Sequence, residues 1–257
     1  MMLDLLIELK DHVFFITLNR IEKHNAFDDS LITQLQKALD SAIENKNVRV
    51  IVLKANGKHF SAGADLAWMQ RMANYTEAEN LADAKQLGRL LSTLSESPKP
   101  TIAMVQGAAY GGGAGLVAAC DIAIAAESAL FCFSEVKLGL IPALISPYVI
   151  RAMGERTASW LFMSAETLSA ERALALNLIQ YCIKDKDLLN YTVDYANKLA
   201  ALPQQALRDC KSLVKTIAHC PINETLRTKT ASLIAKKRVS TEGQAGLKTF
   251  LNKHHRT

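Results

Sequence analysis

Apolar and polar residues follow two different periods along the first two thirds of the chain. From Asp29 to Asn45 the apolar side chains recur every three or four positions, which predicts an amphipathic helix. Shorter apolar runs predict strands, and the first two of these runs form a hairpin. The expected strands are 3–8, 13–18, 48–53, 101–105, 121–126, 130–133 and 178–183. Strands that alternate with helices up to about residue 183 predict an α/β core.

Capping and breaking residues set the expected ends of the helices. Thr76 and Glu79 form a capping box that opens a helix to about residue 95, where two prolines follow. Ser146 and Pro147 are expected to cap a helix that Gly154 ends. Further helices are expected over 64–73, from the glycines near 111 to about 120, twice within 155–177, and over most of 185–253. The chain is therefore divided into a core, 1–195, and a helical region, 196–257.

Composition and charge narrow the classes of function. Of the 257 residues, 49% are apolar and 21% are charged, which is typical of a globular protein and excludes disorder, collagen and coiled coil. The net charge of +5 is spread along the chain, so it suits a small phosphate-bearing ligand better than nucleic acid or an anionic membrane. Five widely spaced cysteines without a Cys-x-x-Cys pair indicate free thiols in a reducing, cytoplasmic setting, and the first residues do not resemble a secretory signal.

Several familiar patterns do not occur in the sequence. The uncharged stretch 101–120 contains five glycines and few large apolar residues, so we expect it to be buried and not to span a membrane. The six histidines show no metal-ligand spacing, and no G-x-S-x-G motif is present. We therefore expect neither a metal site nor a serine hydrolase.

Two loops of small residues could supply catalytic hydrogen-bond donors. Ser61–Asp65 and Gly111–Gly113 each precede an expected helix, where backbone N–H groups have no intrahelical acceptor. Two such N–H groups directed at one oxygen form an oxyanion hole, which stabilises negative charge that develops on a carbonyl. Taken singly, each loop is also explained as a tight turn, because glycine permits close packing.

Glu135 is the candidate acid or base. It follows the apolar residues Phe131–Phe133, and burial there would raise the pKa of its carboxyl group toward neutrality. A structural ion pair with Lys137 or an arginine is the competing explanation. A dinucleotide fingerprint is a further alternative, since Gly113–Ala118 matches G-x-G-x-x-A and an acidic residue follows. It fits poorly, because residues 106–110 separate the glycines from the preceding strand and Glu135 does not end the next one.

Three motifs in order resemble those of one protein family. HFSAGADL (59–66), VQGAAYGGGAGLVAACDIAIA (105–125) and FSEVKLGLIP (133–142) are similar to segments of the enoyl-CoA hydratase/isomerase (crotonase) superfamily. LNRIEKHNAF (18–27) and TEGQAGLKTFLNK (241–253) extend the resemblance over nearly the whole chain. The resemblance implies an α/β spiral of ββα units and a helical C-terminal region that drives assembly into trimers, or into hexamers as dimers of trimers. It also implies an acyl-CoA thioester substrate and no separate cofactor, because coenzyme A is part of the substrate.

The same resemblance implies roles for individual residues. The N–H groups of Ala64 and Gly112 would surround the thioester oxygen, and Glu135 would be the catalytic acid and base. The remaining implied contacts are with coenzyme A: Ala62, Ala64, Asp65 and Leu66 beside the adenine and pantetheine, Arg20 and Ala26 near the nucleotide, and Phe250 and Lys253 toward the CoA of a neighbouring subunit.

The chain departs from the family pattern at Gly115. Hydratases of the family carry a glutamate three residues after the oxyanion glycine, so one of the two groups that would hold water is missing here. A Δ3-Δ2 enoyl-CoA isomerase with one glutamate is therefore an alternative, and a non-catalytic CoA-binding protein is another. Segments 62–69 and 134–149 nevertheless resemble the bacterial 3-methylglutaconyl-CoA hydratases of leucine breakdown and the related carboxygeranoyl-CoA hydratases, which favours hydration. Lys137 and Arg151 are the nearest cations for a distal carboxylate, although both are also explained as surface charges.

Overall fold

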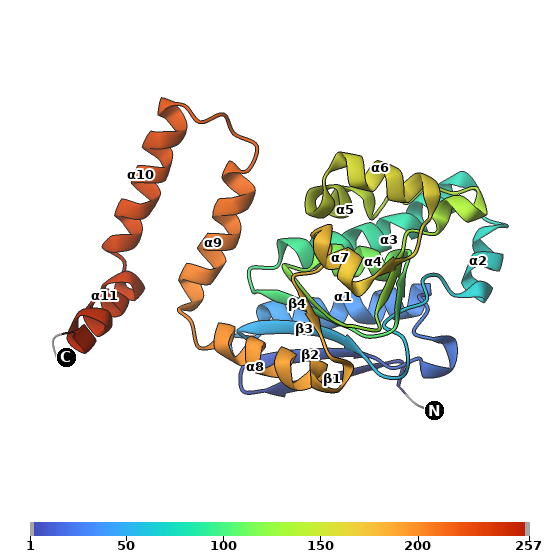
Figure 1. Cartoon of the computed structure of the whole chain (residues 1–257), viewed down its shortest axis with the longest axis horizontal. Helices are drawn as coiled ribbons and strands as arrows, with labels where there is room; N and C mark the ends of the chain where they lie inside the picture. Colours follow the sequence, from blue (N-terminus) through green and yellow to red (C-terminus); the bar gives the residue numbers. More distant parts are fainter. Residues whose placement is uncertain (1–2, 255–257) are drawn as a thin grey trace. The chain divides into compact units, whose positions relative to one another are not determined.

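The structure, a computed structural model, describes residues 3–254 and divides the chain into two compact units after Ala200. The first unit holds both sheets and the helices α1 to α8 (Figure 1). The expected boundary at residue 195 lies inside α8 (Leu188–Ala200), which belongs to the first unit. The three helices that follow α8 form the second unit.

A six-stranded sheet forms the centre of the first unit, in the order β1-β2-β3-β4-β6-β9. β1 pairs antiparallel with β2, as the hairpin pattern predicted, and every other neighbouring pair is parallel. Parallel strands require crossover connections, which helices supply here. The strands are Leu5–Lys10, Val13–Leu18, Val50–Ala55, Thr101–Val105, Ile122–Ala126 and Tyr181–Ile183.

Helices cover both faces of this sheet at its central strands, whose alternate residues supply the two cores, whereas β1 is exposed after Leu5. In β2, Phe14 and Ile16 belong to one core, whereas Val13 and Phe15 belong to the other. α8 covers the second face (Figure 1), where it contacts β2, β3, β4 and β6. Burial on both sides explains why the strands appear in the sequence as continuous apolar runs. The first face is covered by α1 (Asp29–Glu44), α3 (Glu77–Glu96) and α4 (Gly112–Ala119).

A second sheet of three short strands lies in the order β5-β7-β8, with bounds Ala108–Tyr110, Leu130–Cys132 and Leu168–Ser169. The chain passes from the first sheet to the second twice, from β4 to β5 and from β6 to β7, and helices follow each time. The fold is therefore α/β with repeated strand–strand–helix units, as predicted. β5 was not predicted, because Ala-Ala-Tyr has weak strand propensity and its partners, β7 and Ser61, are distant in sequence.

Several helix and strand ends differ from the prediction for local reasons. The N-cap of α5 (Ser146–Met153) is Ile145 and not Ser146, whose hydroxyl donates to the carbonyl of Ala143 (2.9 Å). β9 starts at Tyr181 because the N–H groups of residues 178 and 179 both donate to a carbonyl of α7 (Ala170–Ala175). α2 (Leu66–Met72) starts two residues later than expected, after Asp65 as its N-cap.

The predicted capping box at Thr76 is confirmed. α6 spans Glu155–Ser164, as one of the two helices expected there.

The second unit consists of α9 (Gln204–Ile217), α10 (Glu224–Arg238) and α11 (Thr241–His254). The breaks predicted at Pro203 and Pro221 are confirmed, since neither proline lies inside a helix. No side chain among residues 201–252 is buried. This unit therefore has no hydrophobic core of its own.

Candidate active site

The two loops of small residues lie beside each other because Ser61 pairs with β5. The N–H of Ser61 donates to the carbonyl of Ala108 (3.0 Å), and the carbonyl of Ser61 accepts from the N–H of Tyr110 (3.0 Å). Gly113 packs directly on this segment, since a Cβ at position 113 would lie 2.8 Å from the Cβ of Ser61. Only glycine fits there, so the chain can bring the 61–65 and 111–113 loops into contact.

Phe27 fixes the direction of the backbone at Ala64. The N–H of Phe27 donates to the carbonyl of Gly63 (2.7 Å), and its carbonyl accepts from the N–H of Asp65 (2.8 Å). Because these bonds flank Ala64, the N–H of Ala64 points to the opposite side of the extended segment, and it has no acceptor among residues 3–254. The expectation that Ala64 lies in a helix is wrong: its N–H is a strand-edge donor that precedes α2.

Gly112 supplies the second unpaired donor. It is the first residue of α4, so its N–H has no intrahelical acceptor, and the described part of the chain offers no other acceptor. A Cβ at position 112 would lie 3.3 Å from two ring carbons of Phe27. Phe27 therefore touches Gly112 with its ring and flanks Ala64 with its backbone, which places both unpaired N–H groups around one buried side chain. Such a pair can stabilise a developing oxyanion.

Glu135 lies beside the start of the same helix. It is the first residue of the 3₁₀ helix η2 (Glu135–Leu138), and a Cβ at Gly111 would lie 3.3 Å from its Oε1. Its Oε2 is buried and has no hydrogen-bond partner in the described structure. Burial raises the pKa of Glu135, and a hydrogen bond from its own backbone N–H opposes this effect. Within residues 3–254 no ion pair of Glu135 is found, which argues against the competing structural explanation.

The side chains of Arg20 and Asp65, both expected near coenzyme A, are paired with each other and with neighbouring residues. The buried Arg20 guanidinium pairs with Asp28 (2.9 Å) and Asp65 (3.6 Å) and donates to the carbonyl of the buried Ala26 (2.9 Å). Asp65 accepts from two backbone N–H groups of α2 and from Lys23 (2.8 Å), and the Lys23 bond lowers the pKa of Asp65. A buried side chain whose polar atoms are already paired has little left to offer a ligand.

The other residues expected to contact coenzyme A are exposed. In the extended segment, Ala62, Ala64 and Leu66 are exposed, whereas the residues between them are buried. One face of this segment is therefore open to a ligand, as alternation in an extended chain requires. Phe250 lies in α11 with 59% of its surface exposed, and the side chain of Lys253 lies outside the described residues.

Two Lys-His pairs beside this segment were missed by the sequence analysis. The rings of His24 and His59 lie 5.1 Å apart, edge to face, and the carbonyl of His24 accepts from the N–H of Ala62 (3.0 Å). Lys23 and Lys58 precede the two histidines. The repeated Lys-His dipeptide was the signal available in the sequence, but only the fold brings the two copies together.

The pairing of His59 predicts a loss of stability in acid. Its Nδ1 accepts from the N–H of Ala108 (3.0 Å), and burial, then His24, then Lys58 lower its pKa below 6.5. The unfolded chain therefore takes up a proton first, so the stabilisation is complete above pH 6.5 and is lost as pH falls through the lowered pKa. We expect Tm to fall less between about pH 7.5 and 5 in His59→Asn, which keeps an acceptor but does not titrate. Equal falls in the two proteins would contradict this.

Arg151, the second cation considered for a distal carboxylate, lies elsewhere. It lines a separate cavity of about 270 Å³ with Val117, Ala118 and Asp121. These residues belong to the C-terminal end of α4 and the turn after it, whereas Gly112 begins that helix. Lys137, in η2, is the nearer of the two to Glu135 in the chain and is exposed.

Among residues 3–254 no three His, Cys, Asp or Glu side chains gather closely enough to bind a metal ion. None of the helices in this range combines the length and the hydropathy that crossing a membrane requires.

Known proteins match most of the chain. The profile of the enoyl-CoA hydratase/isomerase family matches residues 8–257. A 2,3-dehydroadipyl-CoA hydratase of Escherichia coli K12 is 30% identical over 253 residues, which cover 98% of this chain and 97% of that protein. A trans-2-decenoyl-[acyl-carrier-protein] isomerase of Streptococcus mutans is 33% identical over 178 residues, 68% of each chain.

Solved structures share the fold. A Legionella pneumophila protein assigned to the enoyl-CoA hydratases/isomerases (crotonases) superposes with a TM-score of 0.95 at 64% identity, covering 97% of this chain and 96% of the other. An enoyl-CoA hydratase from Shewanella pealeana superposes with a TM-score of 0.93 at 44% identity, covering 97% and 94%.

Proposed function

Because the chain belongs to the enoyl-CoA hydratase/isomerase family, we propose that it adds water across the 2,3 double bond of an enoyl-CoA thioester. The observation that carries this proposal is the pair of unpaired N–H groups at Ala64 and Gly112 next to the buried carboxyl group of Glu135. Hydratase names among the relatives support hydration over other reactions of the family. Coenzyme A enters as part of the substrate, and the proposal needs no separate cofactor.

The two N–H groups would act on the thioester oxygen. Attack at C3 moves electron density through C2 onto this oxygen, so negative charge grows there as the enolate forms. Donors held in a fixed position stabilise that charge without reorganising, which contributes about 3 kcal/mol for one donor. The Phe27 contacts hold both donors before substrate arrives, which is the preorganisation that the reaction needs.

Glu135 would act twice in one turnover. Its carboxylate takes a proton from water while the water oxygen bonds to C3, and the resulting carboxylic acid then protonates C2 of the enolate. One H and one OH are added to the double bond, and Glu135 returns to its starting form. A raised pKa favours this exchange, because the acid and the base are then closer in energy near neutral pH.

A Δ3-Δ2 enoyl-CoA isomerase is the second candidate, and the glycine at position 115 is the observation that favours it. The same groups suffice, since Glu135 could remove a proton from C2 of a 3-enoyl-CoA and return it to C4. Turnover in ¹⁸O-labelled water followed by mass spectrometry separates the reactions. Label in a 3-hydroxyacyl-CoA product would support hydration, whereas double-bond migration without label would replace hydration by isomerisation. Binding of thioester without either product would indicate a non-catalytic protein.

We propose 3-methylglutaconyl-CoA as the first substrate to test, which would place the enzyme in leucine breakdown within the cytoplasm. The support is the resemblance of segments 62–69 and 134–149 to hydratases that act on it. Its distal carboxylate needs a cation, and Lys137 is the exposed cation next to Glu135 in η2. Lys137→Ala is expected to lower kcat/KM about tenfold for 3-methylglutaconyl-CoA and little for crotonyl-CoA, as loss of one charged contact would. Equal losses for both substrates would remove Lys137 from this role.

The open face of Ala62, Ala64 and Leu66 supports binding of the CoA moiety along this segment. Lys58 precedes this segment in the chain and Lys23 pairs with Asp65 inside it (2.8 Å); both lysines are exposed, and cations there suit the phosphates of coenzyme A. In this proposal the exposed lysines contact the phosphates in place of Arg20, because the Arg20 guanidinium is buried in ion pairs.

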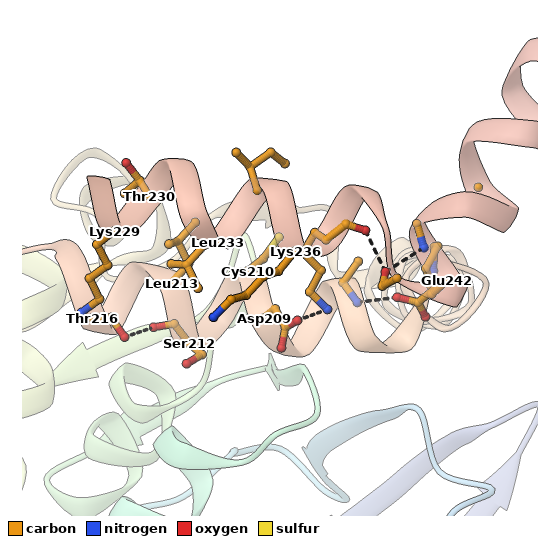
Figure 2. A pocket seen from close by; sticks show the side chains of 17 residues that line it. Asp209, Cys210, Ser212, Leu213, Thr216, Lys229, Thr230, Leu233, Lys236 and Glu242 are labelled. Atoms are coloured by element: carbon orange, nitrogen blue, oxygen red, sulfur yellow. Dashed lines mark hydrogen bonds and ion pairs between the residues drawn. The ribbon is translucent and has the colours of Figure 1, made fainter. Parts of the chain in front are cut away.

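We also propose that the C-terminal unit mediates assembly into a trimer, or a hexamer built from two trimers. A groove of about 850 Å³ lies between α9, α10 and α11 (Figure 2). Its walls include Leu213, Leu233 and Ile234. Glu242 ties the start of α9 to α11 by accepting from two backbone N–H groups. Three helices without a buried side chain are not expected to be stable alone, so a second copy of the chain is the proposed cover.

Leu233→Lys is expected to reduce the assembly to smaller species, because it places a charge in the apolar groove. Light scattering coupled to size-exclusion chromatography measures the mass directly. Val239→Lys is the matched control, since this residue is 78% exposed and does not line the groove. An unchanged mass in Leu233→Lys, or a monomeric parent protein, would contradict the proposal.

A further inference from the structure

Ile145 occupies the space that a side chain at position 115 would need. A Cβ placed on Gly115 would overlap Cγ2 of Ile145 and would lie 2.8 Å from its Cβ. Ile145 is buried, with 2% of its surface exposed, and it is the N-cap residue of α5. Any residue larger than glycine at 115 would therefore have to displace a packed side chain.

The contact lies one helical turn from Glu135. The N–H of Gly115 donates to the carbonyl of Gly111 (3.0 Å), and residues four apart share one face of a helix. A Cβ at Gly111, the N-cap of α4, would lie 3.3 Å from Oε1 of Glu135, and a Cβ at Gly115 would overlap Ile145 about 5.4 Å further along the helix. A side chain at 115 would thus project on the face of α4 that adjoins Glu135.

The surroundings of this face are otherwise apolar. The side chains nearest to Gly112 are Phe27 and Leu87, and Ile145 is the one nearest to Gly115. Oε2 of Glu135 has no partner among the described residues, so no second protein group shares its proton. Glu135 is therefore the carboxyl group beside this face of α4, and the packing of Ile145 leaves no room for a second one at position 115.

We propose that Ile145 determines the reaction specificity of this site, because it excludes a second acid/base group at position 115 and so sets the ratio of hydration to double-bond isomerisation. This inference rests on the proposed function. Hydration breaks an O–H bond of water and forms C3–O and C2–H bonds, whereas isomerisation breaks C2–H and forms C4–H without water. Glu135 alone can balance either reaction. Only hydration gains from a second acceptor that holds the water.

The test replaces both residues in one protein. Gly115→Glu with Ile145→Gly removes the overlapping atoms, and glycine is acceptable at the N-cap. Gly115→Gln with Ile145→Gly is the matched control, because it fills the same space without a carboxylate. Both are compared with Ile145→Gly alone and with Gly115→Glu alone, for ¹⁸O incorporation, double-bond migration, the pH profile and Tm.

We expect the glutamate pair to raise the ratio of hydration to isomerisation at least about tenfold over the glutamine pair. Its pH profile is expected to gain a second titration, since two nearby carboxyl groups titrate as a coupled pair. Gly115→Glu alone is expected to have a much lower Tm than the glutamate pair. If the glutamate pair does not fold, Gly115→Asp with Ile145→Gly, compared with the matching asparagine pair, is the second variant, and the same changes are expected.

Two results would overturn the inference: equal ratios and pH profiles in the carboxylate and amide pairs, or a Gly115→Glu protein with the parent Tm. If the parent protein turns over neither thioester, the proposed function fails instead. The Tm comparison would still show whether Ile145 excludes a side chain at position 115.

Discussion

Glu135→Gln is expected to lower kcat for hydration by about 10³-fold, with little change in Tm. Glutamine has the same size and shape but cannot exchange a proton, and Oε2 of Glu135 has no hydrogen-bond partner among the described residues. The steady-state rate with crotonyl-CoA, together with thermal unfolding, measures both quantities.

Glu166→Gln is the control, because this exposed glutamate lies in the same unit and is expected to keep the parent rate. The parent enzyme is also expected to lose kcat/KM in acid, as Glu135 takes up a proton at a pKa above its ordinary value near 4.5. A Glu135→Gln protein with near-parental turnover would remove Glu135 from the chemistry.

Gly112→Pro is expected to lower kcat by about 10²- to 10³-fold, because it deletes one of the two N–H groups proposed to hold the thioester oxygen. Gly112 is the first residue of α4, where proline is tolerated since its missing N–H has no intrahelical acceptor. KM is expected to change less than kcat, because the charge on the oxygen is largest in the transition state.

Gly112→Ala is the control for the added Cβ. It places a Cβ at the same tight distance from Phe27 but keeps the N–H. The difference in kcat between the proline and alanine variants therefore reports the loss of the N–H together with the Cδ that replaces its hydrogen. Equal kcat values in these two variants would show that this N–H makes no contribution to catalysis.

Patterns of residues close together in the sequence were sufficient to predict most of the secondary structure. The hairpin at 5–18, the amphipathic helix α1 and the capping box at Thr76 depend on residues close in sequence, and each was predicted. The strand β5 and the true start of α2 depend on distant partners, Ser61 with β5 and Phe27 with Ala64, and each was missed.

The candidate site shows the same division. The glycine loops and Glu135 were identified because small residues before a helix and an acid among apolar residues are local patterns. The buried ion pair of Arg20 with Asp65 was not predicted, because a sequence does not show that two charges pair with each other in the interior.

The α/β class, the family resemblance and the candidate acid could all be predicted, since they follow from periodicity and from motifs that are contiguous along the chain. The buried ion pairs, the direction that Phe27 gives to two N–H groups and the need for glycine at position 115 became visible only in the folded chain, because hydrogen-bond partners and excluded volume are set by residues that meet in space. β6, β7 and η2 separate Ile145 from Gly115 along the chain, and the two residues meet only once α4 and α5 have packed.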